Sequence, residues 1–189
     1  EDPRLHYAST KARAERLVAE SGLAATILKP SVMWGERDGF FNILADLVRR
    51  SPLIVPVPGR GLSRFQPFAV ADLARCVALS LERDTTIGGR YELGGPRIWT
   101  YREIVEEVIR TLGARRTILP LPVPLVFAVA RAAELVRVPF PVASDQVRQL
   151  ALDNVTSLDA VERAFGFVPL DMAGRLGYLR RPRAEQEPA

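Results

Sequence analysis

The spacing of apolar and polar positions predicts a helix at the start of the chain, from His6 to Glu20. Gly22 follows at the position of a helix C-cap. The next apolar stretch, Ala24–Leu28, has the continuous apolar character of a parallel strand covered on both faces, and Pro30 ends it. A helix, a short turn and a buried strand in this order make half of a βαβ unit. The apolar side of the helix consists of Tyr7, Ala14, Leu17 and Val18.

Helical and extended patterns alternate through the middle of the chain. We expect helices at 40–50 and 69–83, separated by short extended pieces. The inner positions of the second helix include Leu73, Val77 and Leu81, and Cys76 adjoins them as a small packed side chain. A short strand at 90–95 comes next.

The last part of the chain is mostly helical. Thr100 and Glu103 form a capping box at the start of a helix that Gly113 closes. The pattern then predicts an extended segment at 116–122, an apolar helix at 123–138, short helices around 143–152 and 158–165, and a disordered tail at 181–189. The apolar helix has two interpretations: a buried helix of a C-terminal lobe, or a docking surface for a membrane or a larger complex.

This inventory predicts an α/β protein with two or three buried strands and about six helices. That is too few strands for a complete doubly wound sheet. The chain also begins at Glu1, directly before a helix that should pack against strands. We therefore expect it to be the C-terminal part of a longer protein.

Composition excludes several classes of protein. The 189 residues are 48% hydrophobic and 25% charged, as in an ordinary globular domain. The net charge of +4 comes from 24 arginines, which are dispersed among acidic residues rather than gathered into a basic stripe, so we expect no nucleic-acid partner. One cysteine cannot form an internal disulfide, and no apolar run is long enough to cross a bilayer. A cytoplasmic or organelle-interior location is the default expectation.

Tyr7 and Lys11 are the candidate chemical pair. Positions i and i+4 share one side of a helix, so the two side chains would point at the same small volume. An ammonium beside a phenol lowers its pKa from about 10, and such a tyrosine can exchange a proton with a substrate carbonyl or alcohol. The alternative is that Tyr7 covers the edge of the core and Lys11 is a surface charge.

Three segments, in the same order, resemble the extended and atypical short-chain dehydrogenase/reductases. The first surrounds the Tyr7-x-x-x-Lys11 pair, the second is similar to the family's Q-P-x-x-V-x-D segment, and the third to its G-G-P…T-x-x-E segment. The closest group is that of the NDUFA9-type accessory subunit of respiratory complex I. The matching residues of the second and third segments are Gln66, Pro67, Val70, Asp72, Gly94, Gly95, Pro96, Thr100 and Glu103.

This resemblance implies a fold, a cofactor and roles for five residues. Residues 1–115 would belong to a Rossmann-type domain that binds NAD or NADP, and residues 116–180 would form a smaller, mostly helical lobe. Tyr7 would be the catalytic acid/base and Lys11 the residue that binds the ribose. Pro30, Ser31 and Val32 would line the nicotinamide end of the site.

The resemblance also places two parts of the site outside this chain. The family's glycine-rich dinucleotide loop and its catalytic Ser/Thr are expected upstream of Glu1. Gly59-Arg60-Gly61 is no substitute, because we expect it neither to follow a strand nor to open a helix. We predict that these 189 residues alone do not hold NAD(P) with useful affinity.

Three functions fit this interpretation. The intact protein could be an oxidoreductase, epimerase or dehydratase acting on a small molecule, a structural subunit or assembly factor of complex I, or a sensor of nucleotide redox state. The resemblance places Arg60 and Arg64 at the border of the substrate cleft, although a solvated turn explains them equally. The aromatic residues Trp34, Phe40, Phe41 and Phe68 fit either an apolar cleft or the core, and Glu36 and Asp38 are interpreted as loop charges.

Overall fold

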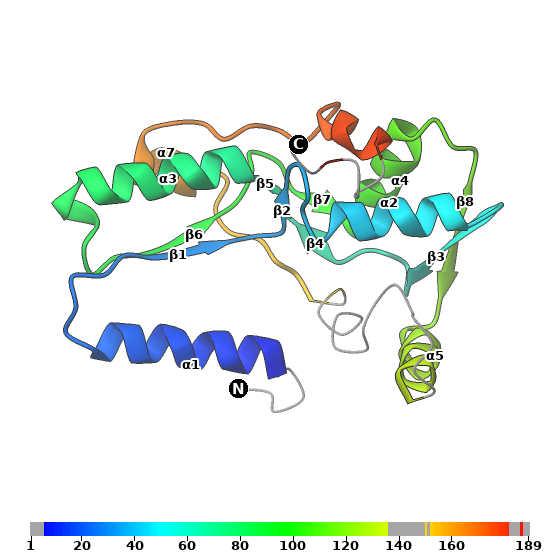
Figure 1. Cartoon of the computed structure of the whole chain (residues 1–189), viewed down its shortest axis with the longest axis horizontal. Helices are drawn as coiled ribbons and strands as arrows, with labels where there is room; N and C mark the ends of the chain where they lie inside the picture. The colour runs from blue at the N-terminus through cyan, green and yellow to red at the C-terminus, as the bar shows by residue number, and fades with distance from the viewer. Residues whose placement is uncertain (1–5, 136–149, 151, 182–185, 187–189) are drawn as a thin grey trace.

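The fold of this chain is given by a computed structural model, which describes residues 6–135, 150, 152–181 and 186. Helices pack around four pairs of strands, three of them parallel and one antiparallel (Figure 1). The predicted α/β class is confirmed.

The first strand pair joins β1 (Ile27–Pro30) to β6 (Arg90–Leu93) in parallel. β1 begins at Ile27 rather than at Ala24, because its register is set by β6, with Ile27 opposite Arg90 and Pro30 opposite Leu93. Its side chains are half-buried or exposed in the described structure. In this chain the strand is therefore not covered on both faces, and cover on both faces stays a prediction for the intact protein.

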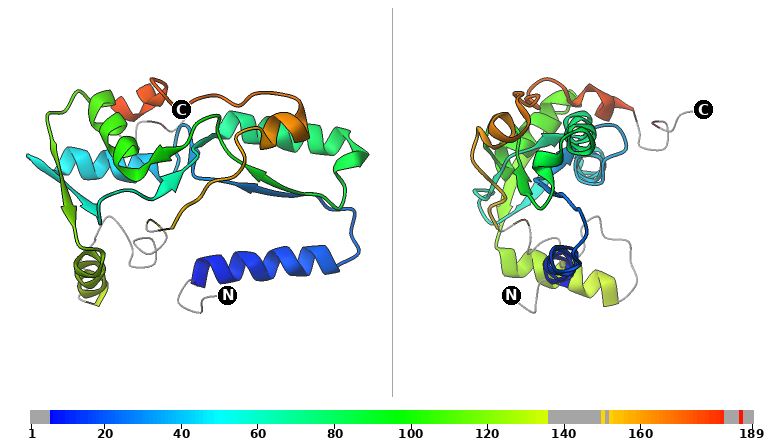
Figure 2. Two further views of the ribbon diagram at one scale, coloured as in Figure 1. Left: turned by 180° about the vertical axis from the view of Figure 1, so that it is seen from behind. Right: turned by 90° about the vertical axis from the view of Figure 1, so that its left-hand side faces the viewer.

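Helix α1 (His6–Glu20) lies alongside this strand pair (Figures 1 and 2). Gly22 after it has a φ of +72°, which confirms the predicted C-cap. Its apolar positions Leu17 and Val18 are 60% and 40% exposed, so they do not pack against the strands of this chain. The contact with the strands is instead electrostatic and comes from Glu15.

β3 (Ile54–Pro58) pairs in parallel with β8 (Thr117–Leu121). The larger core lies between β3 and three helical elements, α2 (Phe41–Arg50), α4 (Tyr101–Thr111) and η2 (Leu176–Arg180). The apolar stripes of α2 and α4 supply most of its side chains. Two short pairs adjoin it: β2 (Met33–Trp34) with β5 (Phe68–Ala69), and β4 (Arg64–Phe65) with β7 (Trp99–Thr100).

A second cluster of buried side chains lies between β6, α3 (Val70–Glu82) and α7 (Ala160–Phe165), with η1 (Asp84–Thr86) following α3. The buried positions of α3 are Asp72 and Cys76, whereas Val77 and Leu81 are 44% and 84% exposed. The predicted inner face was therefore wrong for these last two residues. The side of α3 that turns inward packs Cys76 and Leu73 into the second cluster, and on it the Asp72 carboxylate accepts from the Leu170 amide, 2.7 Å away.

Two local predictions are confirmed. The Thr100 hydroxyl accepts from the Glu103 amide at 3.2 Å, and the Glu103 carboxylate accepts from the Thr100 amide at 2.7 Å, so the capping box is complete. Gly113 follows α4 with a φ of +64°.

Trp34, Phe41 and Phe68 are buried in the core and do not line a cleft.

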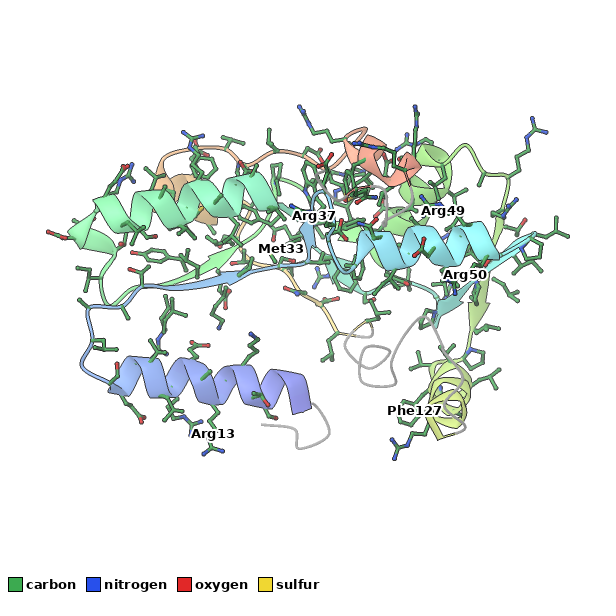
Figure 3. The ribbon with its side chains drawn as sticks, in the orientation of Figure 1. Arg13, Met33, Arg37, Arg49, Arg50 and Phe127 are labelled. Atoms are coloured by element: carbon green, nitrogen blue, oxygen red, sulfur yellow. The ribbon has the colours of Figure 1, made fainter. Side chains whose placement is uncertain are left out.

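Helix α5 (Val123–Leu135) projects from the end of β8, on the same side of the molecule as α1 (Figures 1 and 2). Leu125 is 51% exposed and Phe127 is half-buried (Figure 3). The described side chains of α5 are thus not those of a buried helix. Among the residues that the structure describes, no helix has the length and apolar character needed to cross a membrane.

Two further predictions fall largely outside the described residues. These are the helix around 143–152, of which only 150 and 152 are described, and the tail at 181–189, of which only Arg181 and Gln186 are. Gln186 is buried, and its amide donates to Asn42 Oδ1 at 2.9 Å. The disorder expected of the tail stays a prediction.

Candidate functional site

The candidate site lies at the carboxyl ends of β1 and β6. Because the two strands are parallel and end opposite each other at Pro30 and Leu93, the loops that follow them meet at one edge. In open α/β sheets, ligands bind outside this edge. Helix α1 runs in the opposite direction to β1, so its first turns lie at the same end of the strand pair (Figure 1).

Tyr7 and Lys11 both lie in α1, four residues apart, and Glu15 continues their row by one more turn. The Glu15 carboxylate is 3.4 Å from Lys29 Nζ on β1 and 3.7 Å from Arg90 Nη1 on β6. The side of α1 that carries Lys11 and Glu15 therefore faces the strand pair. The catalytic contact between Tyr7 and Lys11 stays a prediction.

Ser31 is bonded within the protein. Its hydroxyl donates to the Asn154 carbonyl at 2.9 Å and accepts from the Gln66 amide at 3.3 Å, and the residue is only 8% exposed. Pro30 and Val32 on either side are half-buried. The Val32 carbonyl accepts from the Phe68 amide at 2.9 Å. These bonds fix the course of the loop at the strand end, and the predicted contact with a nicotinamide stays a prediction.

Gln66 is fully buried and uses both ends of its side-chain amide. Nε2 donates to the Gly95 carbonyl at 2.7 Å, and Oε1 accepts from the Thr156 amide at 2.8 Å. It thus joins the loop after β6 to the returning segment near Asn154. The sequence motif indicated that Gln66 matters, but not which atoms it would bond.

The two glycines of the third matched segment are needed for close packing around Gln66. A Cβ on Gly94 would lie 2.4 Å from the Gln66 side-chain carbon Cδ. A Cβ on Gly95 would lie 2.1 Å from the Pro67 carbonyl oxygen. Four of the residues that carried the family resemblance, Gln66, Pro67, Gly94 and Gly95, therefore meet at one point and shape the edge of the site.

Asp38 lies in the loop before α2, as predicted, but its carboxylate is half-buried and bonded within the protein. Its Oδ1 accepts from the amides of Phe40, Phe41 and Asn42 at 2.6–3.2 Å, and Oδ2 accepts from the Tyr178 hydroxyl at 2.6 Å. Burial raises the pKa of this carboxyl group, and its hydrogen bonds oppose the shift. Asp38 caps the start of α2 and anchors η2.

Arg64, one of the two arginines predicted to border a substrate cleft, and Glu36, predicted to be a loop charge, both form ion pairs within the protein. The Arg64 guanidinium forms a forked pair with Asp153, with Nε and Nη2 at 2.8 and 2.7 Å from Oδ2. Glu36 pairs with Arg181 at 3.0 Å. Both pairs are exposed and tie loops together.

The Gly59-Arg60-Gly61 turn does follow a strand, β3, contrary to the prediction. The next element is β4 rather than a helix, so the turn is not a dinucleotide loop. A Cβ on Gly61 would lie 2.9 Å from Val57 Cγ1, and the Gly61 carbonyl accepts from the Arg102 amide at 3.0 Å. The turn packs against the start of α4.

Comparison with known proteins supports the predicted resemblance in sequence. No protein-family model matches the chain. It is 33% identical over 168 residues to NADH dehydrogenase (ubiquinone) 1 alpha subcomplex subunit 9, mitochondrial, of Arabidopsis thaliana, covering 86% of this chain and 41% of that protein. It is 29% identical over 117 residues to the mitochondrial 40 kDa subunit of NADH-ubiquinone oxidoreductase of Neurospora crassa, covering 61% and 30%. The chain thus spans less than half the length of these relatives.

Solved structures support the resemblance in fold. A nucleoside-diphosphate-sugar epimerase from Staphylococcus aureus matches with a TM-score of 0.65 and 17% identity, over 96% of this chain and 61% of that one. A dTDP-glucose 4,6-dehydratase from Streptomyces venezuelae, solved with NAD bound, matches with a TM-score of 0.63 and 21% identity, over 95% and 51%. The predicted short-chain dehydrogenase/reductase fold and the resemblance to the complex I subunit group are confirmed. The relatives are mitochondrial by name, so they give no support to a cytoplasmic location.

Proposed function

We propose that this chain, a relative of the complex I subunit 9 proteins with the fold of the sugar-nucleotide epimerases, is the C-terminal part of an NAD(P)-dependent oxidoreductase or epimerase. One observation carries the proposal. Glu15 pairs with Lys29 on β1 and Arg90 on β6, so the side of α1 that carries Lys11 and Glu15 faces the strand pair; Tyr7 precedes Lys11 by one turn, toward the end of the sheet where such folds bind ligands.

The described residues fit the ribose and nicotinamide half of such a cofactor. Lys11 is an exposed ammonium-bearing residue of α1, and the loop at Pro30 and Val32 is fixed in place by the bonds of Ser31. A bound NAD(P) would supply or accept the hydride. In the intact protein, Tyr7 would exchange the proton of the substrate oxygen, and Lys11 would hold the ribose and lower the pKa of the Tyr7 phenol.

A second candidate function is that of an accessory subunit or assembly factor of respiratory complex I that holds its nucleotide without turnover. The observation that favours it is the similarity to the Arabidopsis subunit over 86% of this chain. The half-exposed apolar helix α5 would then give a surface for contact with a larger complex or a membrane.

A Tyr7→Phe change in the full-length protein separates the two candidates. If Tyr7 is the acid/base, turnover falls by about 10²-fold or more while NADPH affinity stays the same. Tyr91→Phe is the matched control, since the Tyr91 ring packs against Phe165 in the second cluster, at a ring-centroid distance of 5.2 Å. Turnover that is the same in the Tyr7 variant and the wild type would contradict catalysis by Tyr7 and favour the structural role.

A further inference from the structure

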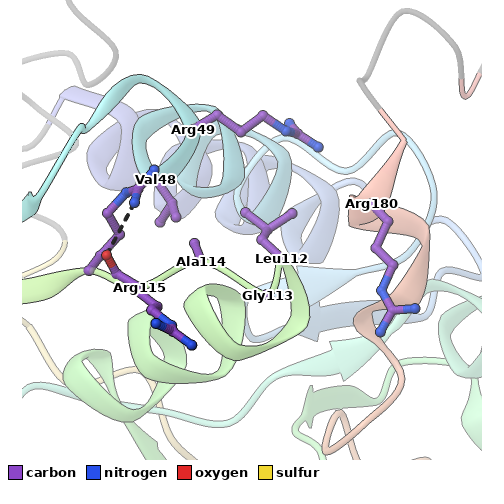
Figure 4. A pocket seen from close by; sticks show the side chains of 8 residues that line it. Val48, Arg49, Leu112, Gly113, Ala114, Arg115 and Arg180 are labelled. Carbon is purple, nitrogen blue, oxygen red and sulfur yellow. Dashed lines mark hydrogen bonds between the residues drawn. The ribbon is translucent and has the colours of Figure 1, made fainter.

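A second site, separate from the edge of β1 and β6, lies where the ends of α2 and α4 meet η2 (Figure 4). Its volume is about 620 Å³, within the range of small-molecule sites. It is lined by Val48, Arg49, Leu112, Gly113, Ala114, Arg115, Arg116 and Arg180.

The lining of this pocket carries an excess of positive charge. It includes four arginines and no acidic residue. Arg49 is compensated, because its Nη1 is 2.7 Å from Asp46 Oδ1. In the described part of the chain, no carboxylate pairs with Arg115, Arg116 or Arg180. Three guanidinium groups around one pocket are therefore left without a counter-charge among these residues.

These three arginines also have N–H groups for which the described residues supply no hydrogen-bond acceptor. The described structure gives Arg180 one hydrogen bond, from Nε to the Thr111 carbonyl at 3.2 Å. Arg116 donates from Nη1 to the Arg115 carbonyl at 3.1 Å, and its Nε is buried with no partner among the described residues. A buried donor without an acceptor is costly, and a guanidinium has five N–H groups, so an oxygen-rich anion would satisfy this donor and several others.

The floor of the pocket is apolar. Val48 is fully buried, Leu112 and Ala114 are half-buried, and Gly113 leaves the space above it open, with no atom within 4 Å of the position of a Cβ. An arginine fork matches the geometry of a phosphate better than that of a spherical anion. We propose that this pocket binds the phosphate group of a small organic phosphate at the unpartnered Nε–H of Arg116, with Arg115 and Arg180 adding positive charge from its two sides and the apolar part of the ligand over Val48 and Leu112.

The test is titration of the full-length protein with inorganic pyrophosphate, followed by calorimetry and by the NMR signals of the arginine Nε–H groups. We expect saturable binding that shifts the Arg116 Nε signal. The double change Arg115→Ala/Arg116→Ala should weaken the affinity by about tenfold or more, since it removes two charged donors. Arg116→Lys keeps the charge but removes the fork and Nε, and it should also weaken binding.

Arg13→Ala is the control for net charge, because Arg13 projects from α1 on another part of the molecule (Figure 3). It should change the affinity by less than about twofold. An equal loss in Arg13→Ala and Arg116→Ala would reduce the effect to general charge attraction and overturn the proposal, as would the absence of any shift at Arg116 Nε. Because Tyr7 and Lys11 lie elsewhere, failure here leaves the proposed function untouched.

Vesicles distinguish the two sources of a phosphate group. Phosphatidylcholine vesicles containing phosphatidic acid would sediment the protein, and pyrophosphate would displace it, if the phosphate belongs to a lipid headgroup. Binding of pyrophosphate without sedimentation would assign the site to a soluble phosphate. Sedimentation that pyrophosphate does not reverse, together with no pyrophosphate binding in solution, would overturn the proposal.

Discussion

The Tyr178 hydroxyl donates to the Asp38 carboxylate at 2.6 Å, and this bond joins η2 to the start of α2 across 140 residues of chain. The other oxygen of Asp38 accepts from three amides at the first turn of α2. One carboxylate thus caps a helix and fixes the segment that covers the larger core.

Asp38→Ala is expected to destabilise the protein by about 2 kcal/mol, from loss of a helix cap and of a charge-assisted hydrogen bond. Urea unfolding followed by circular dichroism measures it. Asp46→Ala is the control, since Asp46 makes one partly exposed pair with Arg49, and it should cost about 0.5 kcal/mol or less. Equal losses in the two variants would contradict the capping role.

The pH dependence of stability follows from the raised pKa of Asp38, for which burial is the main cause. The native state then binds the proton more tightly than the unfolded state, so stability falls as pH rises from the ordinary pKa of 3.8 through the raised value. Asp38→Asn removes this titration. We expect the stability of the wild type, relative to this variant, to decline over that range; a difference that is flat or increases with pH would contradict it.

Glu103 makes stability depend on pH in the opposite direction to Asp38. Its bonds to Thr100 lower the pKa of its carboxyl group, so its contribution is present above the ordinary value of 4.5 and is lost as pH falls through the lowered one. Thr100→Ala is expected to cost about 1 kcal/mol at neutral pH by removing one half of the capping box. Thermal unfolding at pH 7 and pH 3 checks both points, with the exposed Glu82→Ala as control.

Gly95→Ala is expected to destabilise strongly, by about 3 kcal/mol or more, because the new Cβ would lie 2.1 Å from a main-chain oxygen that cannot move aside cheaply. Gly177→Ala is a matched control, since no atom lies within 4 Å of that position and the backbone there is not left-handed. Denaturant midpoints of the two variants should differ clearly. Similar midpoints would show that the loop after β6 relaxes freely.

Calorimetry of the 189-residue chain with NADPH is expected to show no measurable binding, because the chain has no glycine-rich loop for the pyrophosphate. The full-length protein, titrated in parallel, should bind. Binding to the shorter chain would show that the residues at the carboxyl edge of β1 and β6 suffice.

Local features of the fold could be predicted from the sequence with good accuracy. The capping box of Thr100 and Glu103 and the left-handed turns at Gly22 and Gly113 depend on contacts within about four residues, which a sequence displays directly. The boundaries of β1 could not be predicted in the same way. They depend on β6, more than sixty residues away.

For the candidate site, the sequence alone predicted the helix that carries Tyr7 and Lys11 and the motifs that meet around Gln66. The tertiary structure decided which side of α1 and of α3 turns inward, and that Asp38 and Gln66 bind partners rather than face water. The reason is physical. A helical period reveals that two sides differ, whereas the side that turns inward depends on partners distant in the chain, such as the buried cluster around Cys76 and the Leu170 amide for α3, and Lys29 and Arg90 for α1.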